Sequence, residues 1–154
     1  MKMNSKLAAI AVSLLLLSSC APNATPTTST TTASVQTNDT KLLNGSWRLI
    51  SLNGKAVSSA DVSRTPQLTF QVAEQRVNGF TGCNRVFGGA TATATHLTFQ
   101  HLGSTRMACA EENLEQPFLA ALSDTTLAYQ VTSTQLTLLK ENQPVLVFTR
   151  TKAE

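Results

Sequence analysis

Apolar and polar residues alternate along much of this chain, and this alternation restricts its fold more than any other feature. Gln67–Val72 reads QLTFQV. Five further segments alternate in the same way or are rich in β-forming residues: Trp47–Leu52, His96–Gln100, Leu127–Val131, Gln135–Leu138 and Val145–Thr149. Successive side chains of a strand point to opposite faces, so a period of two buries one face and leaves the other in water. Short strands at this spacing predict an all-β sandwich or barrel.

Turn signals separate these segments. Asn53-Gly54 follows the first of them directly. This dipeptide is a strong hairpin signal, because a type I′ turn needs positive φ at both central residues. Ser133-Thr134 predicts a second turn between two of the later strands.

One segment, Leu114–Ser123, has helical periodicity instead. Its apolar residues fall on one helical face: Leu114, Phe118, Leu119 and Leu122. Pro117 resists a helix interior, so we expect Asn113 to cap the helix and Gln116 to complete a capping box, with Pro117 just beyond the first turn. Three glutamates are expected to form a solvated helix start that the helix dipole favours: Glu111, Glu112 and Glu115.

The N-terminus has the layout of an export signal. Lys2 and Lys6 precede the apolar run Leu7–Leu17, and the small residues Ser18-Ser19 follow it. Eleven helical residues rise roughly 16 Å, about half of the hydrocarbon core of a bilayer. We therefore predict a cleaved signal peptide over residues 1–19 rather than a permanent membrane helix.

Leu17-Ser18-Ser19-Cys20 resembles the lipobox of bacterial lipoproteins, in which the cysteine is acylated and becomes the mature N-terminus. The alternative is an ordinary secretory signal with an incidental cysteine. Several acyl chains on Cys20 would anchor the protein stably to a membrane. Ala21 rather than Asp follows the cysteine, which in a host with two membranes implies the outer membrane, facing the periplasm.

Residues 20–43 are predicted to be a tether. The stretch Ala21–Thr40 is rich in Thr, Ser, Asn and Pro and nearly free of large apolar residues, so it cannot bury enough surface to offset its ordering entropy. We expect a disordered spacer, with a glycosylated stalk as the alternative. The folded domain is expected over residues 44–152.

Charge gives no reason to expect nucleic-acid binding. The precursor has twelve Lys and Arg against nine Asp and Glu, and removal of Lys2 and Lys6 leaves ten against nine, a net charge of +1. The arginines are scattered and do not alternate with aromatic residues. We expect a monomer whose partners are the membrane, through Cys20, and an envelope protein.

The stretch Gly79–Gly89, GFTGCNRVFGG, invites interpretation as a phosphate-binding loop. A Walker-type loop needs a Lys followed by Ser or Thr, and a dinucleotide fingerprint needs a βαβ unit; neither is present. Its glycines are better explained as bends, bulges or tight turns of a curved sheet: Gly79, Gly82, Gly88 and Gly89. We expect no cofactor.

Metal binding and nucleophilic catalysis are also poorly supported. The chain has no C-x-x-C pair, and His96 and His101 would point to opposite faces of one strand, so we expect both at the surface and no metal site. Cys83 lacks an activating motif, and no G-x-S-x-G elbow surrounds a serine. We expect no enzymatic activity.

Two cysteines remain once Cys20 is assigned to lipid, and exported thiols are usually oxidised. Cys83 and Cys109 are therefore expected to form a disulfide, with two buried free thiols as the alternative. A bridge of this span would stabilise the domain by roughly 3.5 kcal/mol in the chain-entropy model.

Two segments form a specific pair: the first motif segment is Gly79–Arg85, GFTGCNR, and the second is Ser104–Cys109, STRMAC. With Phe70, Gly88 and Glu115 before Phe118–Leu122, they resemble the META domain family, that of HslJ-like heat-shock-associated lipoproteins. Gly45-x-Trp-x-Leu and Leu146-x-Phe-x-Arg, near the two ends of the domain, also fit. The resemblance covers about Gly45 to Arg150, nearly the whole folded part.

This resemblance implies a mainly β, α+β fold: a small, strongly curved antiparallel sheet, partly barrel-like, with one packed helix. It implies an envelope lipoprotein linked to heat and antibiotic stress and supplies no catalytic residues. The residues that match the family pattern are Gly79, Gly82, Asn84, Arg85, Thr105 and Arg106. Internal hydrogen bonding is the favoured role of the four polar ones, and ligand contact is the alternative.

We therefore expect a non-enzymatic lipoprotein that acts in envelope stress tolerance by binding an envelope component. The main alternative is a lipocalin-like carrier with a small apolar ligand inside the sheet, which requires a cavity there. A third is an inhibitor of an exported protease, for which the small-residue stretch Gly88–Thr95 would have to be an exposed rigid loop.

Overall fold

The computed structural model describes residues 39–57, 65–109, 114–123 and 125–151. The signal peptide, Cys20 and the tether as far as residue 38 lie outside these ranges, as do Glu111, Glu112 and Asn113. Within the described ranges, no helix combines the length and the apolar character needed to cross a membrane.

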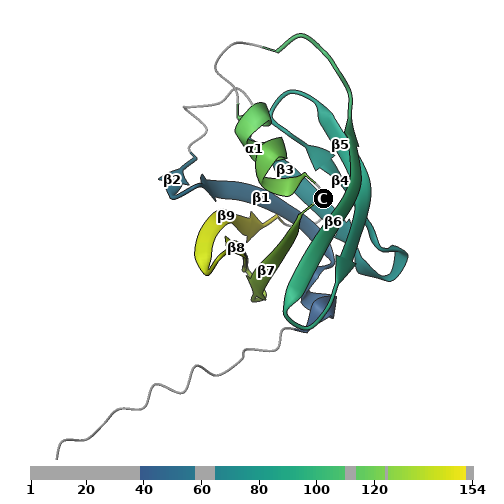
Figure 1. Ribbon diagram of the computed structural model, residues 1–154, viewed down its shortest axis with the longest axis vertical. Helices are drawn as coiled ribbons and strands as arrows, with labels where there is room; N and C mark the ends of the chain where they lie inside the picture. The colour runs from purple at the N-terminus through teal and green to yellow at the C-terminus, as the bar shows by residue number, and fades with distance from the viewer. Residues whose placement is uncertain (1–38, 58–64, 110–113, 124, 152–154) are drawn as a thin grey trace, which may run out of the picture. The chain divides into compact units, whose positions relative to one another are not determined.

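The described part of the chain forms one antiparallel sheet whose hydrogen bonding closes into a ring (Figure 1). Its strands are β1 (Gly45–Leu52), β2 (Lys55–Ala56), β3 (Gln67–Gln71), β4 (Arg76–Phe80), β5 (Arg85–Ala92), β6 (His96–Ser104), β7 (Thr126–Val131), β8 (Gln135–Lys140) and β9 (Gln143–Arg150). Strands β3 to β9 pair in chain order, and β1 pairs with both β3 and β9. The predicted mainly β, curved and partly barrel-like fold is confirmed.

The ring closes where the two ends of the domain meet. Trp47 of β1 and Arg150 of β9 are register partners, and the Arg150 guanidinium lies 4.1 Å from the centroid of the Trp47 ring. Arg150 Nη1 donates to the carbonyl of Asn44 at 2.7 Å, and Trp47 Nε1 donates to the carbonyl of Leu43 at 2.8 Å. The two segments near the ends of the domain that fit the family pattern, in β1 and β9, are thus paired and in direct contact.

The folded part begins earlier than predicted. Thr40–Leu43 form a short 3₁₀ helix, η1, and the Leu43 side chain is fully buried. These residues had been assigned to the tether because the polar stretch before them has no apolar periodicity. The segment is held by Arg150 of the distant β9, which donates to the carbonyls of Leu42 and Asn44, and by Trp47, which donates to the Leu43 carbonyl; local composition does not reveal these contacts.

The core lies inside the ring and follows the predicted alternation. Strand positions that point inward are occupied by large apolar side chains: Trp47, Leu49, Leu68, Phe70, Leu97, Phe99, Leu127, Leu136, Leu138, Leu146 and Phe148. A register shift between Leu49 and Ser51 lets both Leu49 and Leu52 face inward, although they are three residues apart. Packed side chains fill the middle of the sheet.

Helix α1 (Glu115–Leu122) supplies the remaining core residues. Phe118 and Leu122 are fully buried, and the Phe118 ring meets that of Phe148 edge-on at 6.3 Å between centroids. The expected cap is wrong: Leu114, not Asn113, is the N-cap, and no side chain bonds there. Pro117 is then the third helical residue, where a backbone N–H would have no partner within the helix in any case.

The turn at Asn53-Gly54 is confirmed, since φ is +49° and +78° at its two residues. The interpretation of Gly88–Thr95 as a loop is wrong. Gly88 to Ala92 belong to β5, which forms a long hairpin with β6, and the turn itself contains only residues 93–95. A protease inhibitor with this segment as its reactive loop therefore has no support.

The burial of Tyr129 should make the stability of the domain depend on pH in the alkaline range. Its side chain is 2 % exposed and its hydroxyl donates to the carbonyl of Thr93 at 2.7 Å. Burial, and to a smaller degree the Asp39 carboxylate, raise the pKa of Tyr129 above its ordinary value of 10.0. The folded state therefore keeps the proton at a pH where the unfolded chain releases it. This contribution to stability is full below the unfolded pKa and declines as pH rises from there through the folded pKa.

We expect the urea midpoint of the domain to fall between about pH 9 and pH 12, measured by circular dichroism. Tyr129→Phe should lose about 1 kcal/mol near pH 8, through the missing hydrogen bond, and should then fall less steeply than the wild type as pH rises. Parallel pH profiles for the two proteins would contradict this explanation.

Candidate functional site

The first motif segment forms the bend between β4 and β5. Asn84 donates its backbone N–H to Thr81 Oγ1 at 2.9 Å, and the Thr81 backbone N–H donates to the Asn84 carbonyl at 2.8 Å. Gly82 has φ +104°, a backbone conformation that residues other than glycine rarely adopt. At Gly79 an added Cβ would lie 2.0 Å from the Gln67 carbonyl oxygen, so β3 and β4 could not pair as they do.

The side chain of Asn84 joins this bend to the second motif segment. Asn84 Oδ1 accepts from the Thr105 hydroxyl and from the backbone N–H of Met107, both at 2.8 Å. The Thr105 hydroxyl oxygen in turn accepts the backbone N–H of Arg85 at 3.0 Å. Asn84 is only 3 % exposed, so these bonds form away from solvent. The two motif segments, about twenty residues apart, are thus held together by one asparagine.

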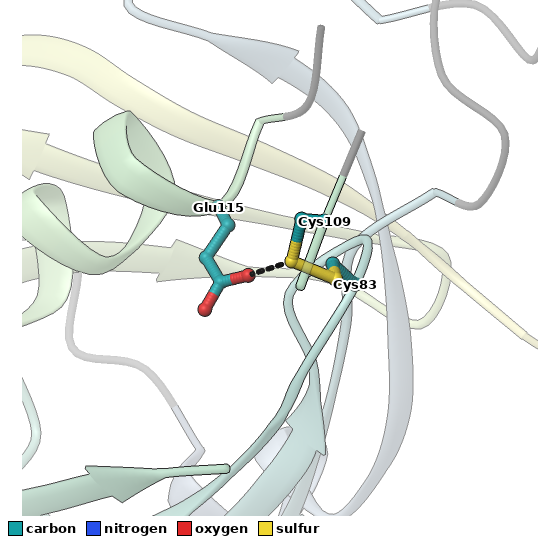
Figure 2. Close-up of side chains that lie close together, drawn as sticks. All are labelled: Cys83, Cys109 and Glu115. Carbon is teal, nitrogen blue, oxygen red and sulfur yellow. Dashed lines mark hydrogen bonds between the residues drawn. A yellow bond between two sulfur atoms is a disulfide. The ribbon is translucent and has the colours of Figure 1, made fainter. Parts of the chain in front are cut away.

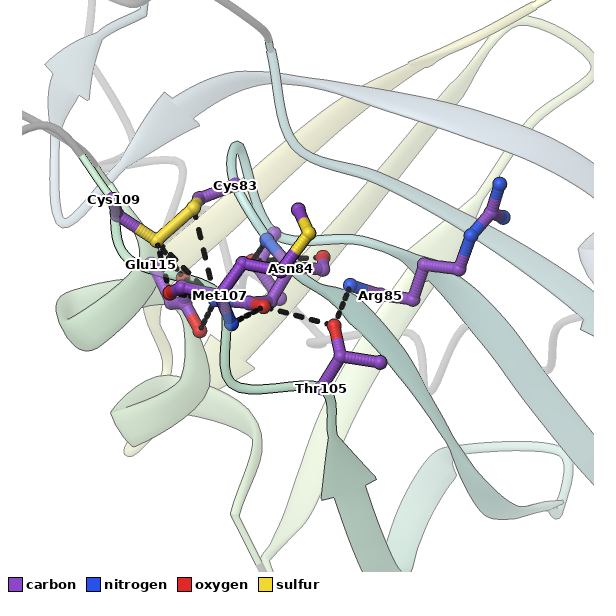
Figure 3. Close-up of a disulfide and its surroundings, with 8 residues drawn as sticks. Cys83, Asn84, Arg85, Thr105, Met107, Cys109 and Glu115 are labelled. Carbon is purple, nitrogen blue, oxygen red and sulfur yellow. Dashed lines mark hydrogen bonds between the residues drawn. A yellow bond between two sulfur atoms is a disulfide. The ribbon is translucent and has the colours of Figure 1, made fainter.

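The amide nitrogen of Asn84 faces the helix and the disulfide (Figure 3). Asn84 Nδ2 lies 2.8 Å from Oε2 and 3.1 Å from Oε1 of Glu115, and 3.2 Å from Cys109 Sγ. Its two protons can serve the carboxylate and one further acceptor at a time. Hydrogen bonds from an amide to a carboxylate contribute about 1.5–3 kcal/mol when they are shielded from water. Asn84 therefore connects three parts of the chain.

Cys83 and Cys109 form a disulfide in the structure, with their Cα atoms 5.8 Å apart. Figure 2 shows the Glu115 carboxylate directed at it, with Oε2 3.2 Å from Cys109 Sγ. A disulfide sulfur carries no proton, so this is a close S···O contact and not a donated hydrogen bond.

These three residues are also the one group of His, Cys, Asp and Glu side chains within the described ranges whose spacing would suit a metal ion. Because the two sulfurs are bonded to each other, neither is a thiolate. The group is therefore not a metal-binding site in this form.

Glu115 was expected to be solvated, and this is wrong: only 7 % of it is exposed. It lies on the same helical face as Phe118, Leu119 and Leu122, at spacings of three, four and seven residues. That spacing was the sequence signal for the burial of Glu115. A glutamate on an apolar helical face is expected to be buried only when its hydrogen-bond partner is known. The partner is Asn84, which is remote in sequence.

The four polar residues of the family pattern separate into two groups. Asn84 and Thr105 are hydrogen-bonded internally, as expected. Arg85 and Arg106 are exposed, and within the described ranges neither guanidinium has a hydrogen bond or an ion pair. Figure 3 shows the Arg85 side chain directed away from Asn84 and the disulfide. Internal hydrogen bonding thus explains the first pair and not the second.

Arg85 lies in the middle of an outward-facing group of apolar side chains, here called the Arg85 face: Phe80, Arg85, Phe87 and Met107. Phe80 and Arg85 are opposite one another across β4 and β5, and Phe87 is two residues further on the same face of β5. Phe87 is 55 % exposed and Met107 61 %. Large apolar side chains this exposed are typical of surfaces that meet a partner.

Two open hollows flank Arg85. One, of about 450 Å³, is lined by Phe80, Cys83, Arg85, Thr105 and Met107. The other, of about 430 Å³, includes Asn78, Phe80, Arg85 and Phe87 in its lining. A third hollow, of about 490 Å³, lies on the other side of the Asn84 network and is bordered by Cys109, Glu115 and Leu119. The two hollows beside Arg85 offer apolar contact around that cation, and the described lining of the third adds Arg106 and the Glu115 carboxylate.

A closed antiparallel sheet with one core helix, whose bend between β4 and β5 is linked to that helix by an asparagine and to the second motif segment by a disulfide, defines a small β-domain of recognisable type. The sequence profile of the META domain matches residues 40–153. The chain therefore belongs to the META domain family.

Two solved structures are similar. One is an NMR structure with 29% sequence identity and a TM-score of 0.55, which covers 71% of this chain and 92% of its own. The other is an NMR structure of a protein from Burkholderia xenovorans, with 33% identity and a TM-score of 0.57, covering 73% of this chain and 86% of its own. No match was found among curated proteins.

Proposed function

We propose that this protein is a lipid-anchored envelope protein whose META domain binds another envelope component through the Arg85 face, and that it acts in tolerance of heat and antibiotic stress. It is not an enzyme. The anchor is proposed on the lipobox-like sequence that ends at Cys20, and the outer membrane on Ala21. The tether before the domain would let the domain reach its partner from the bilayer.

The observation that carries the binding proposal is the exposure of Phe87 and Met107 beside Arg85, whose guanidinium is also exposed and has no hydrogen bond or ion pair within the described ranges. Covering the exposed part of two such side chains removes apolar area from water and contributes about 1 kcal/mol or more for each, since burying a whole side chain of this size contributes about 1.5–3 kcal/mol. An arginine and an aromatic side chain in the centre of a patch are also the residues most often found to dominate binding energy. The favoured partner surface is apolar with a central anion.

The alternative of a carrier for a small apolar ligand is less well supported. It needs space inside the ring, and the inward positions there are filled by side chains such as Trp47, Phe118 and Phe148, all fully buried. The described hollows beside the Arg85 face open to solvent and would suit part of a partner better than an enclosed ligand.

Mass spectrometry of the mature protein tests the anchor. We expect an N-terminal peptide that starts at Cys20 and carries a diacylglycerol modification. Cys20→Ser should release the protein from the membrane fraction into the soluble fraction. An unmodified thiol at Cys20 in membrane-associated protein would contradict the proposal.

Site-specific photo-crosslinking in cells tests the binding surface. A photoreactive phenylalanine analogue at Phe87 should give a discrete adduct, whereas the same analogue at Gln143, an exposed position on β9, should not. Arg85→Glu should lower the yield at position 87 several-fold, because it reverses the central charge. Equal adduct patterns from positions 87 and 143 would refute the Arg85 face as the binding surface.

A further inference from the structure

The contacts of the disulfide differ from those of a purely structural cross-link. Neither Cys83 nor Cys109 is fully buried, and each sulfur-bearing residue borders a different open hollow. Cys109 Sγ has a carboxylate oxygen at 3.2 Å and an amide nitrogen at 3.2 Å, whereas the same amide nitrogen is 3.7 Å from Cys83 Sγ. The polar groups are thus concentrated on one of the two sulfurs.

The Glu115 carboxylate gains a hydrogen-bond donor when the Cys83–Cys109 disulfide is reduced. In the disulfide, Cys109 Sγ offers no proton to Oε2. A Cys109 thiol would offer an S–H at the same distance, and hydrogen bonds to a charged acceptor are among the stronger ones. Glu115 therefore favours the reduced form relative to a side chain without a charge.

We infer that Cys83–Cys109 is a thiol–disulfide exchange site whose co-substrate is a dithiol. One thiolate of the dithiol attacks Cys83 Sγ from the hollow bordered by Phe80 and Met107, and the electron pair of the broken bond leaves with Cys109 Sγ. Cys109 takes up the proton that the attacking thiol released and keeps it as a thiol, whose S–H donates a hydrogen bond to Glu115 Oε2. The second thiol of the dithiol then breaks the mixed disulfide, and Cys83 takes up the second proton.

The exchange is balanced and stoichiometric. Two electrons and two protons pass from the dithiol to the protein, which ends with two thiols, while the co-substrate ends as a disulfide. Cys109 is the leaving sulfur because Asn84 Nδ2, 3.2 Å away, can donate to it as the bond breaks, and because its protonation avoids a lasting thiolate beside the Glu115 carboxylate. The inference goes beyond the proposed binding function and does not depend on it.

Equilibration with mixtures of reduced and oxidised dithiothreitol tests the inference on the purified full-length chain in detergent. Acid quenching, alkylation and peptide mapping report Cys83 and Cys109 separately from Cys20. Fluorescence of Trp47, the single tryptophan, shows whether the domain stays folded. We expect reduction in the folded state at a rate within about tenfold of that in urea. Reduction that occurs only as fast as the domain unfolds would overturn the inference.

Glu115→Gln tests the role of the carboxylate. Removing its charge should shift the exchange equilibrium about tenfold toward the disulfide, which corresponds to roughly 30 mV. Glu74→Gln, at a position in the exposed η2 turn (Val72–Glu74), should leave the equilibrium unchanged. If Glu115→Gln fails to fold, Glu115→Asp replaces it as the test. Its shorter side chain keeps the charge but moves it away from Cys109 Sγ, so we expect a smaller shift of the equilibrium toward the disulfide. No shift in the folded variant would overturn the role of Glu115.

The source of the dithiol can be distinguished by comparing two cysteine-pair peptides, one with aromatic and one with glycine neighbours. The apolar hollow next to Cys83 should accelerate exchange with the aromatic peptide several-fold, which would identify protein-borne dithiols as the co-substrate. Equal rates would identify small dithiols. Failure of both peptides and of dithiothreitol to reduce the folded protein would overturn the exchange site and leave the Arg85 face untouched.

Discussion

Asn84→Asp should destabilise the domain by about 3 kcal/mol or more at neutral pH, although it replaces one atom by another of nearly equal size. The substitution places a carboxylate oxygen where Nδ2 lies, 2.8–3.1 Å from the two oxygens of Glu115. Two carboxylates this close cannot both ionise without a large penalty, and the new group also loses its donor to the disulfide sulfur. The packing of the bend is preserved, so the effect isolates the electrostatics.

Urea unfolding monitored by Trp47 fluorescence measures this effect. Asn78→Asp is the matched control, since Asn78 is an exposed asparagine on the adjacent strand β4 and should change stability by no more than about 0.5 kcal/mol. Lowering the pH should recover part of the stability of Asn84→Asp, because one shared proton removes the repulsion. Equal midpoints for Asn84→Asp and Asn78→Asp would show that the Asn84 network contributes little.

Trp47→Ala should cost about 3–5 kcal/mol through the loss of buried aromatic contacts and the cavity left behind. Trp47 is fully buried, donates to the Leu43 carbonyl and lies under the Arg150 guanidinium. Its removal therefore also loosens η1 and the pairing of β1 with β9. Small domains are stable by only about 5–15 kcal/mol, so we expect much of the variant to unfold at moderate temperature.

Thermal unfolding followed by circular dichroism measures this loss without relying on the tryptophan itself. Ile50→Ala on the same strand is the control, because Ile50 is 36 % exposed and should cost far less. Amide exchange should rise in residues 40–43 in Trp47→Ala and not in Ile50→Ala. If the amides of η1 stayed protected from exchange in a destabilised Trp47→Ala variant, the role of Trp47 in closing the ring between β1 and β9 would be contradicted.

The strands that a single sequence predicted well are those that bury one face. Leu68 and Phe70, or Leu136 and Leu138, alternate with polar residues and point inward as expected. Strands β4 and β5 were not predicted as such, because Gly79, Gly88 and Gly89 interrupt their alternation and glycine has no side chain to alternate. Gly79 is required by the close approach of the β3 backbone, a condition that exists only once the sheet has formed.

The candidate site was predictable only in part. The cysteine count indicated the pair Cys83 and Cys109, and the family resemblance indicated Asn84 and Thr105. The burial of Glu115 was not predicted, because it depends on an asparagine thirty-one residues earlier. The outward direction of Arg85 was not predicted either, since it follows from the start of β5 at Arg85: Arg85 and Phe87 are exposed and Val86 between them is buried.

A double-mutant cycle between Asn84 and Glu115 tests most directly the central claim, that their hydrogen bond ties the first motif segment to helix α1 and so supports the Arg85 face. Unfolding free energies would be measured for the wild type, Asn84→Ala, Glu115→Ala and the double variant. We predict a coupling of at least about 1.5 kcal/mol, in the range for buried polar partners. Additivity of the two single effects within about 0.5 kcal/mol would contradict the claim.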